Sequence, residues 1–331
     1  MADVYRIFGA ELSPYSVKVR SYFRYKRIPH AWIERNATNI EEFRRHARLP
    51  LIPLVIRPDG SALQDSTPII ETLEAEYAEP AIHPADPALA FVSALLEEYA
   101  DEWGNKWMFH FRWTYEPDQK SAAERLARAN AVGQSEEAIA SLAQSVIARM
   151  VPRLSFVGSS EKTAPCIEAS YARCLERVEA HLETRRYLFG ERPAFADFGL
   201  FAQLHQCWTD PTAGARLEKG APRVKAWIER MLQPVARGDF EGWDALGPTL
   251  EPLLRDEVGA RFLPWSTANA AALAASEPRF AVELAGERFE QDTQKYHARS
   301  LRALRERYAA VADRSELDPI LERTDCLRWL R

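Results

Sequence analysis

The chain has 331 residues, of which 47% are hydrophobic and 27% charged, and its formal net charge is −5 at pH 7. A chain of this length accommodates about two domains, each large enough to bury its own core. Charges of both signs are scattered, without the basic face of a nucleic-acid binder or the basic amphipathic helix of a membrane-surface protein. We therefore expect small-molecule or protein ligands, and neither nucleic acid nor membrane.

Compartment and metal content follow from cysteine, histidine and apolar patterns. The N-terminus lacks a basic segment followed by an apolar one, and no apolar run reaches the roughly 18 residues of a membrane-spanning helix. The four cysteines form no C-x-x-C pair, and the seven histidines show no H-x-x-x-H or H-E-x-x-H spacing. These patterns favour a cytoplasmic protein without signal peptide, disulfide framework or metal site.

The first eighty residues alternate between strand and helix patterns. Ser13 and Pro14 are typical of an N-cap followed by a first helical residue, and Pro29 closes that helical stretch. The order β-α-β-α-β-β-α predicts one α+β domain over residues 1–80. Its remaining expected elements are strands at Val4–Phe8, Ala31–Glu34, Ile52–Ile56 and Ala62–Gln64, and helices at Ile40–His46 and Asp65–Tyr77.

A linker rich in proline and aspartate, residues 81–88, precedes a region with helical periodicity throughout. Residues 89–331 therefore predict an all-helical domain, with a C-terminal extension from about residue 245. We expect flexible segments at Glu116–Ser121 and Gly158–Pro165. The expected helices are Phe91–Trp113, one or two within Ala122–Met150, Ile167–Leu182, Phe195–Gln206, Val224–Leu232 and a charged helix near Glu287–Tyr308.

Three segments carry a family resemblance: Ser13-Pro14-Tyr15-Ser16 after the first strand, Ile52-Pro53 before the third, and Gln64-Asp65-Ser66-Thr67 at the third helix. With Gly190–Phe198, which is similar to the G-x-(S/T)-x-x-D segment of the helical domain, they resemble the glutathione S-transferases over roughly residues 4–235. The resemblance implies a thioredoxin-like glutathione-binding domain followed by an all-α domain. It also implies glutathione as co-substrate and a homodimer.

Ser13 stands where some classes of this family place a catalytic serine. A thiol has a pKa of about 8.5, and lowering it by two units requires about 2.7 kcal/mol. A helix N-terminus contributes about 0.3–1 kcal/mol and a charge-assisted hydrogen bond about 1.5–3 kcal/mol, so the two together are sufficient. The alternative is a plain helix cap. Ser16 replaces the second redox cysteine, which argues against disulfide exchange, and Tyr15 is a further candidate thiol contact.

Pro53 matches the family's cis-proline, which implies that the backbone of Ile52 pairs with the cysteinyl part of glutathione like an added strand. Asp65 and Ser66 match the acidic-serine pair that holds the γ-glutamyl end; the alternative is a plain capping pair. Leu51 departs from the family pattern, because many members carry a basic residue there for the glycyl carboxylate. Arg48 is a candidate replacement, with Arg44 and Arg45 as further options.

Two further features complete the sequence analysis. Ala194 stands at the family's Ser/Thr N-cap, so Asp197 keeps only half of a capping box. Tyr99, Trp103, Trp107 and Phe111 recur every four residues, and the last three are candidates for a pocket that binds flat, apolar substrates. A packed core or a dimer interface is the alternative for this stripe.

The leading functional hypothesis is a transferase that activates the glutathione thiolate for attack on a hydrophobic electrophile. Two alternatives remain open: a glutathione-dependent lyase or isomerase using the same site, and a non-catalytic binding or scaffold protein of the same fold.

Overall fold

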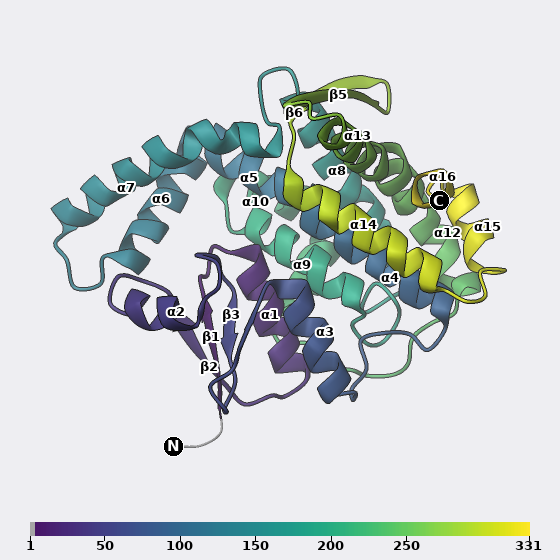
Figure 1. The fold of residues 1–331 in the computed structure, drawn as a ribbon, viewed down its shortest axis with the longest axis horizontal. Helices are drawn as coiled ribbons and strands as arrows, with labels where there is room; N and C mark the ends of the chain where they lie inside the picture. Colours follow the sequence, from purple (N-terminus) through teal and green to yellow (C-terminus); the bar gives the residue numbers. More distant parts are fainter. Residues whose placement is uncertain (1–3) are drawn as a thin grey trace.

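The computed structural model describes residues 4–331, and its N-terminal part forms the lower region of the view in Figure 1. This part contains a four-stranded mixed sheet with strand order β2-β1-β3-β4. β1 runs parallel to β2 and antiparallel to β3, which is antiparallel to β4. The elements are β1 (Tyr5–Gly9), α1 (Pro14–Tyr25), β2 (His30–Glu34), α2 (Ile40–His46), β3 (Leu54–Ile56), β4 (Ala62–Gln64) and α3 (Ser66–Glu76). The predicted element order is confirmed.

The two faces of this sheet bury alternate residues, as the period of a strand requires. Ile7 and Val55 belong to the large core that includes α1 and α3, whereas Phe8 and Leu54 pack with Phe43 of α2 in a separate cluster. The sheet is thus covered on both faces, and only its edges and strand ends remain available for a ligand.

The second part is helical and is built around α9, which is buried along nearly its whole length. α9 contacts α1 of the sheet domain as well as α4, α5, α10 and α11, so it is the central helix of the molecule. Its companions are α4 (Pro87–Tyr99), α5 (Asn105–Thr114), α6 (Glu116–Asn130), α7 (Glu136–Met150), a 3₁₀ turn at Val151–Val157, α8 (Ala164–His181), α9 (Phe195–Trp208), α10 (Pro211–Gly220) and α11 (Pro222–Met231).

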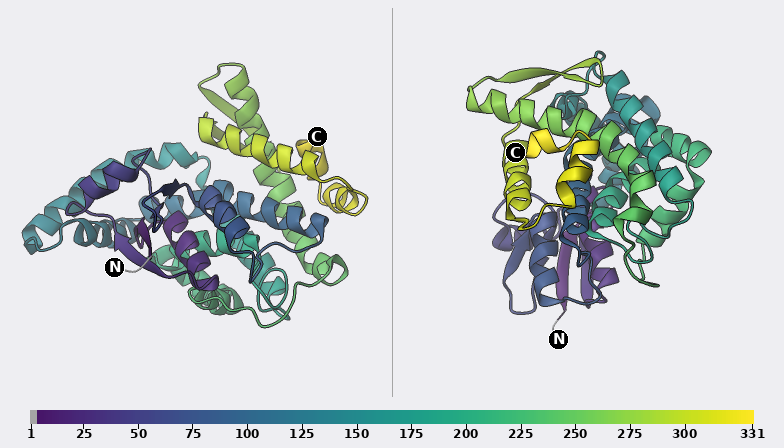
Figure 2. Two further views of the ribbon diagram at one scale, coloured as in Figure 1. Left: turned by 60° about the horizontal axis from the view of Figure 1, so that its bottom comes forward. Right: turned by 90° about the vertical axis from the view of Figure 1, so that its right-hand side faces the viewer.

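The C-terminal extension folds back over the helical domain, on the opposite side of the molecule from the α6–α7 pair (Figure 2). It contacts α4 and α8, so it is part of the same packed body. Its elements are α12 (Trp243–Leu253), a π-helical stretch at Leu254–Phe262, α13 (Leu263–Ala274), β5 (Arg279–Leu284), β6 (Glu287–Asp292), α14 (Lys295–Ala310), α15 (Leu317–Arg323) and α16 (Leu327–Leu330).

Several predicted elements need correction. The helix predicted at Phe91–Trp113 begins at Pro87, where Asp86 caps it, and a π-helical turn at Ala100–Gly104 interrupts it. Glu116–Ser121, predicted to be flexible, is the first part of α6. The charged helix predicted near residue 287 starts only at Lys295, because the preceding residues form the second strand of a hairpin. The helical domain therefore carries one two-stranded sheet.

Candidate functional site

Strand register brings the predicted site segments to one edge of the sheet. Leu54 lies opposite Phe8 on one side and opposite Gln64 on the other, in antiparallel pairs. The residues that precede Leu54 therefore lie beside the residues that follow Phe8 and Gln64. The segments gathered at this edge are those predicted to hold the thiol ligand: Ser13, Ile52–Pro53, Asp65 and Ser66. We call these residues the thiol edge.

Ser13 caps α1, with φ −106° and ψ 115°, and its Oγ accepts a hydrogen bond from the Ser16 backbone N–H at 3.3 Å. Pro14 is the first helical residue, as predicted. The capping interaction uses the hydroxyl oxygen as acceptor. Within residues 4–331 the Ser13 hydroxyl donates its own proton to no protein atom, so it is available to a ligand. The Ser16 hydroxyl is fully buried and has no partner within the described residues.

The loop before Ser13 is held by the helical domain. Arg112 on α5 donates through Nη1 to the Leu12 carbonyl at 2.9 Å, and Gln206 on α9 donates to the Glu11 carbonyl at 2.7 Å. Arg112 itself forms a buried ion pair with Asp210 at 2.7 Å. Sequence reasoning missed these supporting residues, because their partners lie about one hundred or more positions away and no local motif marks them.

The Ile52–Pro53 bond is cis, as predicted. Gln64 fixes the segment in front of it through four hydrogen bonds. Its Oε1 accepts from the backbone N–H groups of Arg48 and Leu49 at 3.1 and 3.0 Å, and its Nε2 donates to the Leu49 and Leu51 carbonyls at 2.7 and 2.6 Å. The Leu51 side chain is 60% exposed at the position where a basic residue was expected.

Asp65 and Ser66 begin α3. Asp65 has φ +78°, its carboxylate makes no capping hydrogen bond, and the Tyr296 hydroxyl of the extension donates to its Oδ2 at 3.1 Å. Asp65 thus stands at the N-cap position of α3 without capping the helix through its side chain. Ser66 is the first residue of the helix and is buried.

A buried ionic network lies beneath this edge and joins the two domains. Lys18 of α1 is fully buried and pairs with Asp101 at 2.6 Å and with Glu97, and it also donates to Thr67 at 3.1 Å. Burial alone would lower the pKa of Lys18, but the Asp101 and Glu97 carboxylates raise it overall, so the amine stays charged. This network fixes the start of α3 relative to α4.

The Tyr15 hydroxyl donates to the backbone carbonyl of Asp101 at 3.0 Å. Burial, followed by the neighbouring Asp101 and Glu102 carboxylates, raises its pKa. The phenol therefore keeps its proton and directs it to the helical domain. Arg48 is exposed, and it donates to Gln64 through its backbone N–H rather than through its guanidinium.

The aromatic stripe is part of the core. Trp103, Trp107 and Phe111 have no exposed surface, and both indole N–H groups donate to Ser170 Oγ, at 2.8 and 3.0 Å. Trp103 also packs edge-on against Trp265 of the extension at 5.6 Å. The packed-core alternative describes these residues, and the predicted substrate pocket is not formed by them in this structure, because the extension and α8 cover the stripe.

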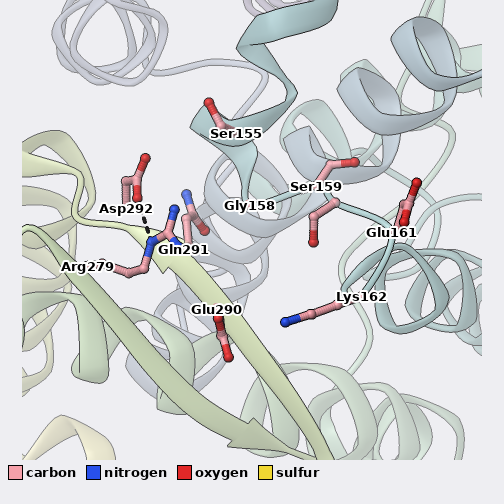
Figure 3. Close-up of a pocket in the computed structure, with 10 residues that line it drawn as sticks. Ser155, Gly158, Ser159, Glu161, Lys162, Arg279, Glu290, Gln291 and Asp292 are labelled. Atoms are coloured by element: carbon pink, nitrogen blue, oxygen red, sulfur yellow. Dashed lines mark hydrogen bonds and ion pairs between the residues drawn. The ribbon is translucent and has the colours of Figure 1, made fainter.

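A cavity of about 430 Å³ lies at the base of the β5–β6 hairpin, away from the predicted site (Figure 3). Its charged lining is largely paired, since Arg279 binds Asp292 at 2.9 Å and Glu290 binds Arg288 at 2.7 Å. It shares no residue with the thiol edge. Within residues 4–331, no helix is long and apolar enough to cross a membrane and no cluster of side chains is suited to a metal ion.

A mixed four-stranded sheet followed by a helical domain defines a two-domain protein whose N-terminal domain is thioredoxin-like. Sequence models of the glutathione S-transferase N-terminal and C-terminal domains match residues 7–81 and 123–230. The chain belongs to the glutathione S-transferase family, and its last hundred residues lie outside both matches.

Three of the solved structures similar to this chain are glutathione S-transferases. A tau class enzyme from mango, Mangifera indica, is 18% identical, covers 76% of this chain and 96% of its own, and has a TM-score of 0.43. A protein from Methylobacterium radiotolerans, in complex with glutathione sulfonate, is 18% identical over 72% and 98% of the two chains with a TM-score of 0.41. One from Methylobacillus flagellatus, with glutathione bound, is 19% identical over 69% and 95%, with a TM-score of 0.42. A search of curated proteins gave no match.

Proposed function

We propose that this protein is a glutathione-dependent transferase in which the Ser13 hydroxyl stabilises the thiolate of glutathione for attack on a hydrophobic electrophile. The observation that carries the proposal is the convergence of Ser13, the Ile52–Pro53 segment and the Asp65–Ser66 helix start at one sheet edge. Family membership supports this assignment, since both domain matches are to glutathione S-transferases.

Each group has a distinct part in the proposed site. The Ser13 hydroxyl has a proton to donate, and its position at the start of α1 adds the positive end of the helix dipole. The backbone of Ile52 pairs with the cysteinyl unit of glutathione. The free N–H groups at the start of α3, with Ser66, take the α-carboxylate of the γ-glutamyl unit, and the Asp65 carboxylate takes its ammonium group.

The experiment that tests the proposal compares wild type with Ser13→Ala. Ultraviolet absorbance of the bound thiolate, followed against pH, should show a thiol pKa raised by about one to two units in the variant, because a charge-assisted hydrogen bond is lost. Conjugation of a generic aryl halide at neutral pH should fall about ten- to a hundredfold and recover in part at high pH. Identical titrations in both proteins would leave Ser13 as a helix cap only.

A second candidate is a non-catalytic binding protein on the same fold. Two observations favour it: Ser13 already serves as a helix cap, and exposed Leu51 provides no charge for the glycyl carboxylate. Absence of aryl halide conjugation, whether or not the protein is retained on immobilised glutathione, would support it. A lyase or isomerase would use the same thiolate, and Ser13→Ala would impair that reaction too.

Assembly as a homodimer in the cytoplasm is part of the proposal. Any dimer surface has to lie outside the part of α4 that α14 covers, because that part is already buried within the chain. Light scattering should give a mass twice the 37.7 kDa of the chain. A mass of one chain would contradict the dimer and leave the proposed reaction untouched.

A further inference from the structure

The C-terminal extension reaches the thiol edge through α14. This helix lies along α4 (Figure 1), where the ring of Tyr308 packs edge-on against Phe91 with centroids 5.8 Å apart. Near its far end Arg307 forms an ion pair with Glu71 of α3. α14 is therefore held against α3, whose N-terminal end borders the proposed γ-glutamyl site, and against α4, whose C-terminal end borders the same site.

The first turn of α14 is anchored next to Asp65. His297 binds the Glu102 carboxylate through Nδ1, and its ring packs edge-on against Trp265 at 4.8 Å. The preceding residue, Tyr296, donates its hydroxyl to Asp65 Oδ2 at 3.1 Å, although 231 positions separate the two in sequence. Because these two contacts hold the half-buried His297 in place, the Tyr296 hydroxyl is presented to Asp65 from a fixed backbone.

The surroundings of this contact are acidic. Tyr296 is 54% exposed, and its partial burial together with the Asp65, Glu102 and Asp101 carboxylates raises the pKa of its phenol, so the hydroxyl keeps its proton for Asp65. One carboxylate oxygen of Asp101, Oδ1, is buried without a hydrogen-bond partner within residues 4–331. Lys18 balances Asp101 through Oδ2, and Asp65 and Glu102 add further negative charge, so the environment favours a positively charged ligand group over a carboxylate.

We propose that Tyr296 is a positioning residue for the ammonium group of the thiol ligand: its hydroxyl orients the Asp65 carboxylate, which receives the γ-glutamyl ammonium. The inference rests on the proposed function. The Asp65 carboxylate makes no helix-cap bond, so without Tyr296 it is free to rotate among its side-chain conformations. Tyr296 removes that freedom before the ligand arrives, and the extension thereby completes a site formed otherwise by the N-terminal domain.

The test measures calorimetric affinity for two thiols, glutathione and an analogue in which the α-amino group is replaced by hydrogen. Three proteins are compared: wild type, Tyr296→Phe, and Arg299→Gln, a control change on the exposed side of the same helix. Tyr296→Phe should raise the Kd for glutathione about fivefold, the equivalent of one exposed hydrogen bond. The Kd for the analogue, and both values for Arg299→Gln, should not change.

A double-mutant cycle identifies the route of the effect. In an Asp65→Asn background, Tyr296→Phe should have almost no further effect on glutathione binding, because the group it positions is gone. Equal affinities of wild type and Tyr296→Phe for glutathione overturn this inference, as does an equal loss for both thiols or tighter binding by the variant. A wild-type protein that binds neither thiol overturns the proposed function together with this inference.

Discussion

The hydroxyl of Ser93 on α4 accepts a hydrogen bond from the backbone N–H of Ala196 in the first turn of α9, at 3.0 Å. It replaces the side-chain cap that Ala194 does not provide. The other half of the capping box is present, because the Asp197 carboxylate accepts from the Ala194 N–H at 2.8 Å. The central helix is thus capped from a neighbouring helix.

Ser93→Ala should therefore lower the free energy of unfolding by about 1–2 kcal/mol, since it leaves a buried N–H without a partner. Ala194→Ser should give little gain, because the N–H groups that a serine would cap are already bonded. Urea unfolding of both variants measures this. A clear stabilisation by Ala194→Ser, with no loss in Ser93→Ala, would contradict the capping role of Ser93.

Lys18→Met should lower the free energy of unfolding by about 3–5 kcal/mol, because it leaves the buried Glu97 and Asp101 carboxylates without their cation. Lys120→Met is the matched control, since the Lys120–Glu116 pair is exposed on both sides. The control should leave the thermal unfolding midpoint unchanged. Similar midpoints for both variants would show that the buried network contributes little.

Gln64→Ala should loosen the segment in front of Pro53, because four hydrogen bonds hold it there. Hydrogen exchange followed by NMR should show faster exchange of the Arg48 and Leu49 amides. Asp59→Ala is the control, since Asp59 accepts from Ser61 at the far end of the same hairpin. If the Arg48 and Leu49 amides exchanged equally fast in both variants, the cause would be a general loosening of the N-terminal domain and not the loss of the Gln64 hydrogen bonds.

Burial lowers the pKa of His181 to about 4, and its ring nitrogens contact the Leu188 carbonyl and the Thr249 hydroxyl, each at 2.8 Å. The unfolded value is about 6.5, so the unfolded state binds more protons between pH 4 and 6.5, and stability falls as the pH drops through that window. Between pH 7 and 5, wild type should lose about 2 kcal/mol relative to His181→Gln. Urea unfolding at the two pH values measures this, and an equal loss of stability in wild type and His181→Gln would contradict it.

The N-terminal domain could be predicted well from sequence because its signals are local. A serine and a proline at a helix start, a proline in front of a strand and a turn at Pro58–Gly60 each act within a few residues. The strand register that brings the site segments together could also be predicted, because the order of these short elements constrains how the strands pair.

The extension was harder to predict because its strands are short and charged. The decisive signal is the two-residue turn Ala285–Gly286, where both residues have positive φ, 50° and 84°. It lies between Leu284 and Glu287, which pair with each other. The charged residues of the second strand resemble the exposed face of a helix, so hydrophobic periodicity alone does not distinguish a strand from a helix in this segment.

The contacts of Tyr296 and Arg112 had no sequence signal at all. Each joins the thiol edge to a segment one hundred or more positions away, and such pairings become visible only in three dimensions. For the same reason the aromatic stripe was ambiguous: helical spacing marks one face of a helix, and the extension that covers this face lies far along the chain.

The hydrogen bonds from Arg112 and Gln206 to the Leu12 and Glu11 carbonyls have a consequence for engineering. The backbone that presents Ser13 is shaped by the helical domain, so the linker is a poor crossover point for chimeras with other transferases. If the N-terminal domain were grafted onto the helical domain of another transferase, it would lose the Arg112 guanidinium and the Gln206 amide, which hold the loop before Ser13. Recombinants that retain arginine and glutamine at these two positions should keep the loop geometry, and libraries are best assembled around that constraint.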